Sequence, residues 1–161
     1  MKFAFYIVLA AIVLALVAAQ VGLLSGQQPV DLGVKDGRLK QPSRTRNSVS
    51  SQAVLFPDHP QRAYATIDPL PFKGASAAAS LKVLETVLQD MPGVTIVEQR
   101  PDYLRAQAQT RWLKFVDDVE FWANPASGVI ELRSASRLGR EDFGVNRKRI
   151  EAIRATYLAA P

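Results

Sequence analysis

The sequence predicts an α+β protein: an antiparallel sheet of about four to five strands with two helices packed on it, preceded by an N-terminal transmembrane helix and an extended tether. Three observations lead to this prediction. Residues 3–24 are apolar and uncharged, residues 77–91 repeat apolar side chains at steps of three and four, and from Val94 onward apolar and polar residues alternate. The first pattern is typical of a membrane span, the second of an amphipathic helix and the third of half-buried strands.

The apolar segment at residues 3–24 has two possible fates. Its only strongly polar residue is Gln20, and at about 1.5 Å per helical residue it is long enough to cross a bilayer. Small residues up to Ala19 also fit a signal peptide cleaved near that position. Because the apolar run continues through Leu24, we favour a retained signal anchor within residues 1–24. The expected location is the bacterial inner membrane, single-pass, with the C-terminal domain on the periplasmic side; the alternative is secretion to the periplasm after cleavage.

Residues 25–60 contain turn formers and no sustained period, so we expect an extended tether that lies over the following domain. The α+β domain is expected to cover residues 61–161. It should open with a short strand over residues 64–67 that Pro69 ends. A helix follows, capped by Ser76 or Ser80, with an apolar stripe at Ala77, Leu81, Leu84, Leu88 and Met91.

Four strands are expected next, in the runs VTIVEQR, YLRAQAQTRW, FVDDVEFWA and GVIELRSAS. Alternation places the core on one face and charge on the other, with Trp112 expected on the core face of the second strand. A last helix is predicted from Asn146, its expected N-cap, with Ile150, Ile153 and Tyr157 on the apolar side.

Positive charge is concentrated near the C-terminus. The net charge is +5 overall, but residues 51–132 carry seven basic and ten acidic residues, and residues 133–161 carry seven basic and three acidic ones. Three cations, Arg147 to Arg149, occupy the first turn of the last helix, where the helix dipole disfavours them. Backbone N–H groups and arginines together suit an anion. The candidate anion-binding residues are Arg133, Ser134, Ser136, Arg137, Asn146, Arg147 and Arg149.

A supporting polar network is expected around these residues, comprising Asn47, Ser50, Ser51, Asp117, Asp118, Glu120 and Asp142. Its acids offer an alternative to an external anion, because carboxylates on neighbouring strands can pair with the arginines. Asp118 and Glu120 share a strand face, as Mg²⁺ or Ca²⁺ ligands would, but the nearby arginines compete for their oxygens. We therefore predict no metal.

Most catalytic patterns are missing from the sequence. It contains no cysteine, one histidine (His59), no G-x-S-x-G, no S-x-x-K and no glycine-rich phosphate loop. Asp117 and Asp118 are adjacent on a strand, so they point to opposite faces and cannot share a proton. We predict no catalytic residues and no cofactor, and the aromatic residues fit a core better than a nucleic-acid surface.

The runs FVDDVEFWANPASGVIELRSASRLGREDFGVNRKRIEAIR at residues 115–154 and RTRNSVSSQA at residues 44–53 closely resemble the family known as domain of unknown function 1499. The resemblance extends from about Asp31 to Leu158 and implies a small membrane-anchored or exported protein, with no activity to carry over. Relatives often have cysteines around the position of Ser48, so any disulfide or metal role of theirs does not transfer to this chain.

Three functions remain open at this point. The favoured one is a non-catalytic binding or accessory domain at the cell envelope, attached to the membrane through residues 3–24, whose anionic partner is a lipid, a glycan or an envelope protein and not a nucleic acid. The second is an envelope hydrolase or transferase that uses Asp117 or Asp118. The third is a purely structural protein with an internal salt-bridge network.

Overall fold

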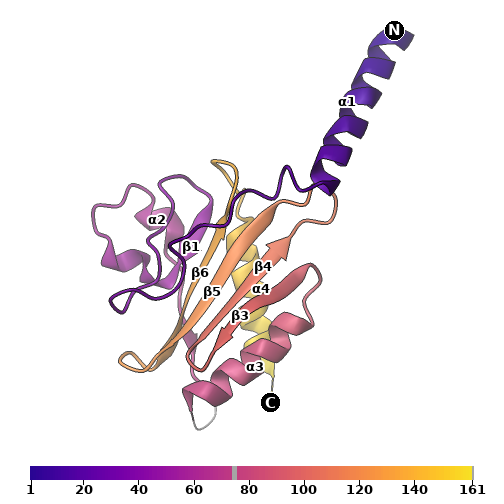
Figure 1. The fold of residues 1–161 in the computed structure, drawn as a ribbon. Helices are drawn as coiled ribbons and strands as arrows, with labels where there is room; N and C mark the ends of the chain where they lie inside the picture. Colours follow the sequence, from indigo (N-terminus) through magenta and orange to yellow (C-terminus); the bar gives the residue numbers. More distant parts are fainter. Residues whose placement is uncertain (74–75, 161) are drawn as a thin grey trace.

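The computed structural model describes residues 1–73 and 76–160. Gly74, Ala75 and Pro161, which fall within the range expected for the α+β domain, lie outside the described residues. The strands form one antiparallel sheet in the order β1-β6-β5-β4-β3, with β2 also pairing with β6. The predicted α+β class is therefore confirmed, with an antiparallel sheet, helices packed on it and an apolar N-terminal helix (Figure 1). The strands are β1 (Ser48–Ser50), β2 (Leu70–Pro71), β3 (Val94–Arg100), β4 (Tyr103–Gln109), β5 (Val116–Asn124) and β6 (Val129–Ser136).

The first helix, α1 (Lys2–Gln20), stands away from the rest of the molecule (Figure 1). It has 19 residues, and its length and apolar composition are sufficient to cross a membrane, a property that it shares with signal sequences. Its side chains are largely exposed. The helix therefore makes little contribution to the core of the domain.

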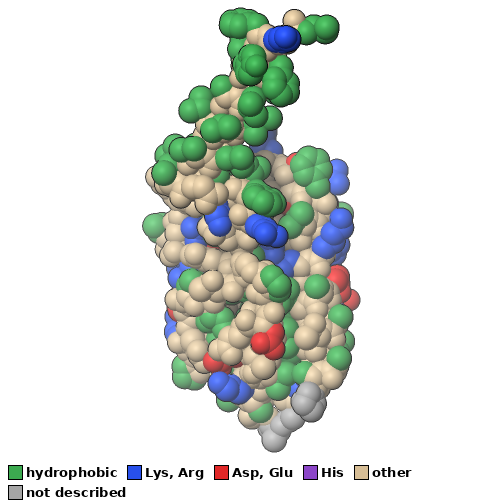
Figure 2. Space-filling view, turned by 90° about the vertical axis from the view of Figure 1, so that its right-hand side faces the viewer, with side chains coloured by type: hydrophobic (Ala, Val, Ile, Leu, Met, Phe, Trp, Pro, Cys, Tyr) green, Lys and Arg blue, Asp and Glu red, His purple; other side chains and the backbone are tan. Residues whose placement is uncertain are grey.

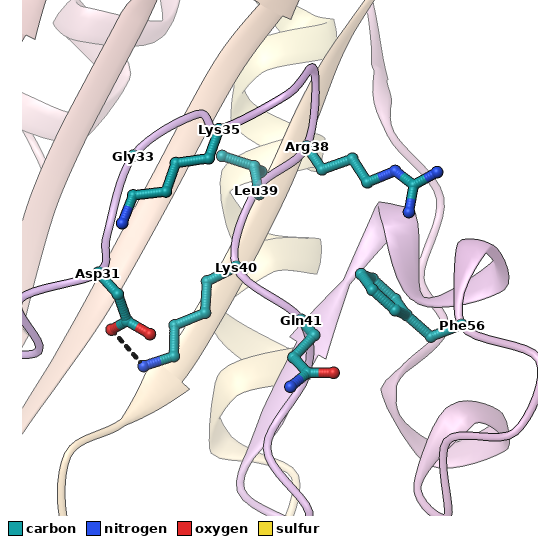
Figure 3. Close-up of a pocket in the computed structure, with 8 residues that line it drawn as sticks. All are labelled: Asp31, Gly33, Lys35, Arg38, Leu39, Lys40, Gln41 and Phe56. Carbon is teal, nitrogen blue, oxygen red and sulfur yellow. Dashed lines mark hydrogen bonds and ion pairs between the residues drawn. The ribbon is translucent and has the colours of Figure 1, made fainter.

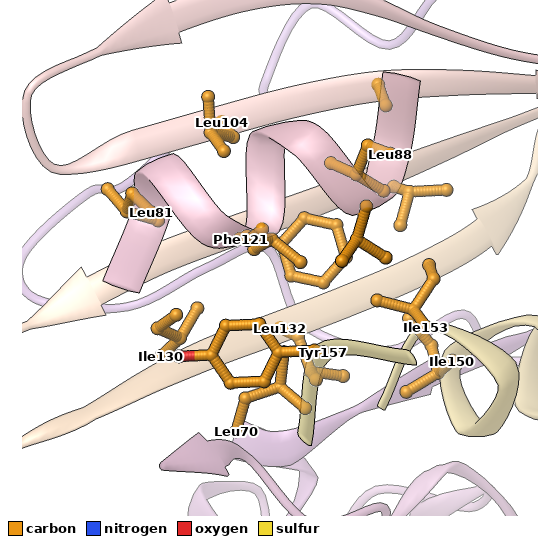
Figure 4. Close-up of a cluster of buried hydrophobic side chains, with 14 of the residues drawn as sticks. Leu70, Leu81, Leu88, Leu104, Phe121, Ile130, Leu132, Ile150, Ile153 and Tyr157 are labelled. Carbon is orange, nitrogen blue, oxygen red and sulfur yellow. The ribbon is translucent and has the colours of Figure 1, made fainter. Parts of the chain in front are cut away.

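The core lies between one face of the sheet and two helices, α3 (Ala77–Gln89) and α4 (Val145–Ala159). Figure 4 shows Leu81 and Leu88 of α3 and Tyr157 of α4 gathered around Phe121 and other strand residues. The predicted helix over residues 77–91 is capped as expected, because the Ser76 hydroxyl accepts a hydrogen bond from the Ala79 N–H at 3.1 Å.

The other face of the sheet is covered by the chain that follows α1. Leu39 is buried there against Tyr103 and Trp122, and the Gly33 N–H donates to the Glu120 carboxylate at 2.7 Å. Residues 48–50 then join the sheet as β1 and lead into a short 3-10 helix, η1 (Ser51–Leu55). Part of the segment expected to be a tether is thus a strand of the domain.

Three local predictions are wrong. Residues 62–65 form a helical turn, α2 (Arg62–Ala65), instead of a strand over residues 64–67. The alternation of apolar and polar residues there is too short to specify a strand. Of residues 64–67, Thr66 makes an isolated β-bridge, to Ser50. The last helix has Gly144 at its N-cap, with φ of 78°, instead of Asn146. Trp112 lies beyond the end of β4 and is 66% exposed.

The position of Trp112 has a local cause. The Thr110 N–H donates to the Phe115 carbonyl at 3.0 Å, and the Phe115 N–H donates to the Thr110 hydroxyl at 3.0 Å. These bonds close a turn over residues 110–115 in which Lys114 has a φ of 56°. The alternation of side chains therefore stops before Trp112.

Candidate functional site

Charged side chains occupy the face of the sheet that the chain after α1 covers. The strand register sets Glu120 directly opposite Arg105 on one side and Arg133 on the other, so all three lie on the same face. Glu120 is fully buried; its carboxylate accepts from Arg133 Nη1 at 3.1 Å and from the Tyr103 hydroxyl at 2.8 Å. Burial and the nearby Glu120 charge raise the pKa of Tyr103, so this phenol remains a donor.

A second ion pair lies further along the same face. Arg137 holds Asp118 in a two-point contact, with both N–O distances at 2.8 Å. Hydrogen bonding to Asp118 raises the pKa of Arg137, which keeps this guanidinium protonated. Arg105 Nη1 lies 3.8 Å from Asp118 Oδ1. These contacts anchor Asp118 at the start of β5.

A cavity of about 420 Å³ opens beside these pairs. Its walls come from Pro29, residues 40–43, Thr45 and Asn47 of the covering chain, and from the ends of β5 and β6 with the loop after β6. We call this space the polar cavity. Its lining includes four cations and a single carboxylate, namely Lys40, Arg133, Arg137, Arg140 and Asp118. Three of the cations pair within the chain, Lys40 with Asp31, Arg133 with Glu120 and Arg137 with Asp118.

Two buried polar atoms of residues that line the polar cavity have no hydrogen-bond partner in the described part of the chain. They are Arg133 Nε, a donor, and Asn47 Oδ1, an acceptor. Both residues are at least nine-tenths buried, at 4% and 5% exposure. Because buried polar groups are almost always satisfied, Arg133 Nε still needs an acceptor and Asn47 Oδ1 still needs a donor.

The start of α4 is occupied by a carboxylate of the chain itself. Asp142 accepts from the Gly144 N–H at 2.9 Å, the Asn146 N–H at 3.2 Å and Asn146 Nδ2 at 2.8 Å, and also from the Tyr64 hydroxyl. Burial opposes ionisation of Asp142, but hydrogen bonds from Tyr64, Asn146 and the backbone outweigh it and lower the pKa of this carboxyl. Burial and the same bond raise the pKa of Tyr64 to about 12.

Two of the three cations in the first turn of α4 are directed to internal partners, and Lys148 is exposed. Arg147 donates to the Tyr64 and Thr66 carbonyls at 2.6 and 2.8 Å. Arg149 pairs with Asp117 at 2.6 Å and donates to the Ser134 hydroxyl at 3.1 Å. The helix dipole and these cations thus act on groups of the same chain.

The structure divides the predicted site residues into two groups. Arg133, Ser136 and Arg137 line the polar cavity together with Asn47 and Asp118. On the helix-facing side of the sheet, Ser134, Asn146 and Arg149 join Asp117. Asn146 connects the two groups, because its amide donates to the Ser136 hydroxyl at 3.0 Å and to the Asn47 carbonyl at 3.2 Å.

The two serines that follow Val49 have local structural contacts. The Ser50 hydroxyl caps η1 by accepting from the Gln52 N–H at 3.2 Å. The Ser51 hydroxyl contacts Glu131 at 2.6 Å and accepts from the Leu132 N–H at 2.9 Å. Neither serine lines the polar cavity.

Sequence reasoning missed the residues of the covering chain and of the loop after β6. Lys40, Gln41, Ser43, Thr45 and Arg140 all line the polar cavity. No period or spacing in residues 25–47 indicates which part crosses the sheet. The only available signal for Arg140 was its place in the basic C-terminal segment.

A second, smaller cavity of about 320 Å³ lies along the covering chain, between Asp31 and Phe56. Figure 3 shows Asp31 and Lys40 joined across it, at an N–O distance of 2.5 Å. The hydrogen bond from Lys40 lowers the pKa of Asp31. Lys40 and Gln41 line both cavities, so the same stretch of chain separates them.

Metal-ligand side chains do not gather at either cavity. Within residues 1–73 and 76–160, no group of three or more His, Cys, Asp or Glu side chains is placed to hold an ion. Asp118 and Glu120, the pair considered from the sequence, are each bound by an arginine.

Comparison with known families gives one match. The profile of a family described as "Protein of unknown function (DUF1499)" matches residues 38–156. A search of curated proteins found no match to this chain. The matched range begins in the covering chain and ends in α4, so it includes most of the lining of the polar cavity.

Proposed function

The chain belongs to the DUF1499 family, and from that premise we propose that it is a membrane-anchored, non-catalytic domain that binds a small anionic ligand in the polar cavity. The observation that supports this most directly is the pair of unpartnered buried atoms, Arg133 Nε and Asn47 Oδ1. A ligand with an anionic oxygen and a hydroxyl group carries the acceptor that Arg133 Nε lacks and the donor that Asn47 Oδ1 lacks. A phosphate ester with a free hydroxyl has this chemistry, whether it is a lipid headgroup or a soluble sugar phosphate.

Charge in the cavity supports an anion. Arg133, Arg137 and Lys40 already use part of their hydrogen-bonding capacity on Glu120, Asp118 and Asp31, but Arg140 adds a further cation. Arg140 is exposed and has no ion pair among the described residues. Its guanidinium is therefore available to a ligand at the cavity mouth.

Binding is tested by calorimetry on the full chain in neutral detergent micelles. Glycerol 3-phosphate should bind saturably and more tightly than inorganic phosphate, and glycerol should not bind. Arg140→Glu should weaken glycerol 3-phosphate about tenfold or more, because it replaces a charge-assisted contact by repulsion. Lys148→Glu is the matched control, with the same change of charge at an exposed position outside the cavity.

Two results would reject the proposal: no saturable binding of glycerol 3-phosphate, or equal binding by the wild type and Arg140→Glu. Adding phosphatidylglycerol to the micelles separates the two ligand sources. Competition by the lipid supports a headgroup ligand, and its absence supports a soluble one.

Membrane anchoring is supported by the composition of α1, and its test is independent of the ligand. The intact mass of the protein extracted from membranes should include residues 1–20. A mass that corresponds to a chain starting after Ala19 would show that the segment is a cleaved signal.

The alternative of a hydrolase or transferase has less support from the geometry. A general base must reach the proton of its substrate. Both carboxylates are instead held in ion pairs within the chain, Asp118 with Arg137 and Asp117 with Arg149 on the opposite face. The alternative of a purely structural protein accounts for the contacts of Arg137, Arg147 and Arg149, which all have partners within the chain. It leaves Arg133 Nε and Asn47 Oδ1 without a hydrogen-bond partner.

A further inference from the structure

The turn between β4 and β5 exposes an aromatic side chain next to positive charge. Trp112 is 66% exposed and Leu113 is 38% exposed. Arg111 precedes them and Lys114 follows, and the Arg111 guanidinium lies 5.0 Å from the Trp112 ring centre. Tryptophan flanked by cations is typical of the boundary between a membrane and water.

This turn lies at the end of the domain from which α1 emerges (Figure 1). The Gln20 side chain, at the last residue of α1, donates to the Trp112 carbonyl at 3.3 Å. The chain after α1 is also packed closely here: Gly26 has a φ of 68°, and a Cβ at this position would lie 2.7 Å from the Arg137 Cβ and 3.0 Å from the Leu138 Cγ. The end of α1 therefore contacts the turn through Gln20, and the chain after α1 packs on Arg137 and Leu138.

The length of α1 determines where this turn lies relative to the membrane. A helix of 19 residues is about 28 Å long, close to the thickness of the hydrocarbon core of a bilayer. With α1 spanning the membrane, Gln20 reaches the headgroup region, and Trp112 lies at the same level. Figure 2 shows hydrophobic side chains over α1, and Lys and Arg side chains gathered on the end of the domain beneath it.

We propose that residues 110–115, together with Leu138, form a seating surface that rests on the leaflet from which α1 emerges. Trp112 and Leu113 enter the headgroup region, and Arg111 and Lys114 contact the phosphates of anionic lipids. This inference depends on the retention of α1 proposed above, but not on a ligand in the polar cavity. Two points of attachment, α1 and the seating surface, fix the orientation of the domain on the membrane.

The two tryptophans of the chain allow a direct test. Trp122 is buried in the domain at 8% exposure. The fluorescence of the Trp122→Phe variant comes from Trp112 alone, and that of the Trp112→Phe variant comes from Trp122 alone. The full chain is reconstituted in vesicles of equal parts phosphatidylcholine and phosphatidylglycerol, with acyl chains brominated close to the headgroup. The emission of Trp112 should be quenched and shifted to the blue, and that of Trp122 should be unchanged.

The charge contribution is tested with Arg111→Gln/Lys114→Gln. This double variant should reduce quenching of Trp112 in the mixed vesicles and leave it unchanged in pure phosphatidylcholine. If Trp122→Phe does not fold, the difference between the wild type and Trp112→Phe supplies the same comparison.

Failure of the anchor and failure of the seating surface give different results. If the protein stays with the vesicles but Trp112 is quenched no more than Trp122, the seating surface is overturned and the anchor is not. Protein of the cleaved mass, recovered free of the vesicles, overturns the anchor and the inference together. Neither result changes the binding of glycerol 3-phosphate.

Discussion

Replacement of Glu120 by alanine is expected to lower the free energy of unfolding by about 3–5 kcal/mol, the usual cost of leaving one member of a buried ion pair without its partner. Glu120 is fully buried and accepts hydrogen bonds from Arg133, Tyr103 and the Gly33 backbone. Without the carboxylate, the guanidinium of Arg133 stays in the interior with Nη1 unpartnered as well as Nε. The covering chain also loses a direct contact with the sheet.

The measurement is urea unfolding of the domain in the full chain, held in detergent micelles and followed by circular dichroism. Glu151→Ala is the control, because its pair with Arg154 is half exposed on the glutamate side. Exposed pairs contribute up to about 1 kcal/mol, so the control should change little. Equal losses in the two variants would contradict the role assigned to Glu120.

Replacement of Asp142 by alanine is expected to cost about 2–4 kcal/mol, since it removes the carboxylate that accepts from the N–H groups at the start of α4 and leaves buried donors unsatisfied. The Tyr64 hydroxyl and the backbone N–H of the fully buried Asn146 both lose their acceptor. The same unfolding measurement applies. Asp58→Ala serves as the control, because Asp58 is an exposed loop carboxylate.

Asp142 also predicts a pH dependence. Its pKa is lowered in the folded protein, so its ionised form stabilises the fold. This contribution is complete above the unfolded pKa of about 3.9 and is lost as the pH falls through the lower folded value. Stability of the wild type should therefore fall more steeply than that of Asp142→Ala below about pH 4. Parallel pH profiles of the two proteins would contradict this assignment.

Local patterns predicted the elements that bury a continuous face. The stripe of Leu81, Leu84 and Leu88 is visible within one window of sequence, as is the alternation through Val119 and Phe121. The hydrophobic effect acts on these faces wherever they pack, so the helix and the strands could be predicted without knowing their partners.

The candidate site could be predicted only in part, because its contacts join distant parts of the chain. The basic segment identified Arg133 and Arg137, but it also suggested an anion at the start of the last helix. Asp142, five residues before Arg147, occupies that position instead. The sequence did not distinguish a carboxylate of the chain from one of another molecule, since both satisfy the same N–H groups.

The sequence by itself determined the apolar N-terminal helix, the α+β class and the apolar stripe of α3, because composition and period are local properties. The motifs at residues 44–53 and 115–154 indicated the family. Only the tertiary structure decided where the chain between Pro29 and Asn47 lies. Its contacts, such as Gly33 with Glu120 and Asn47 with Gly139, join residues about ninety positions apart. Those long-range contacts create the polar cavity, and no local pattern specifies them.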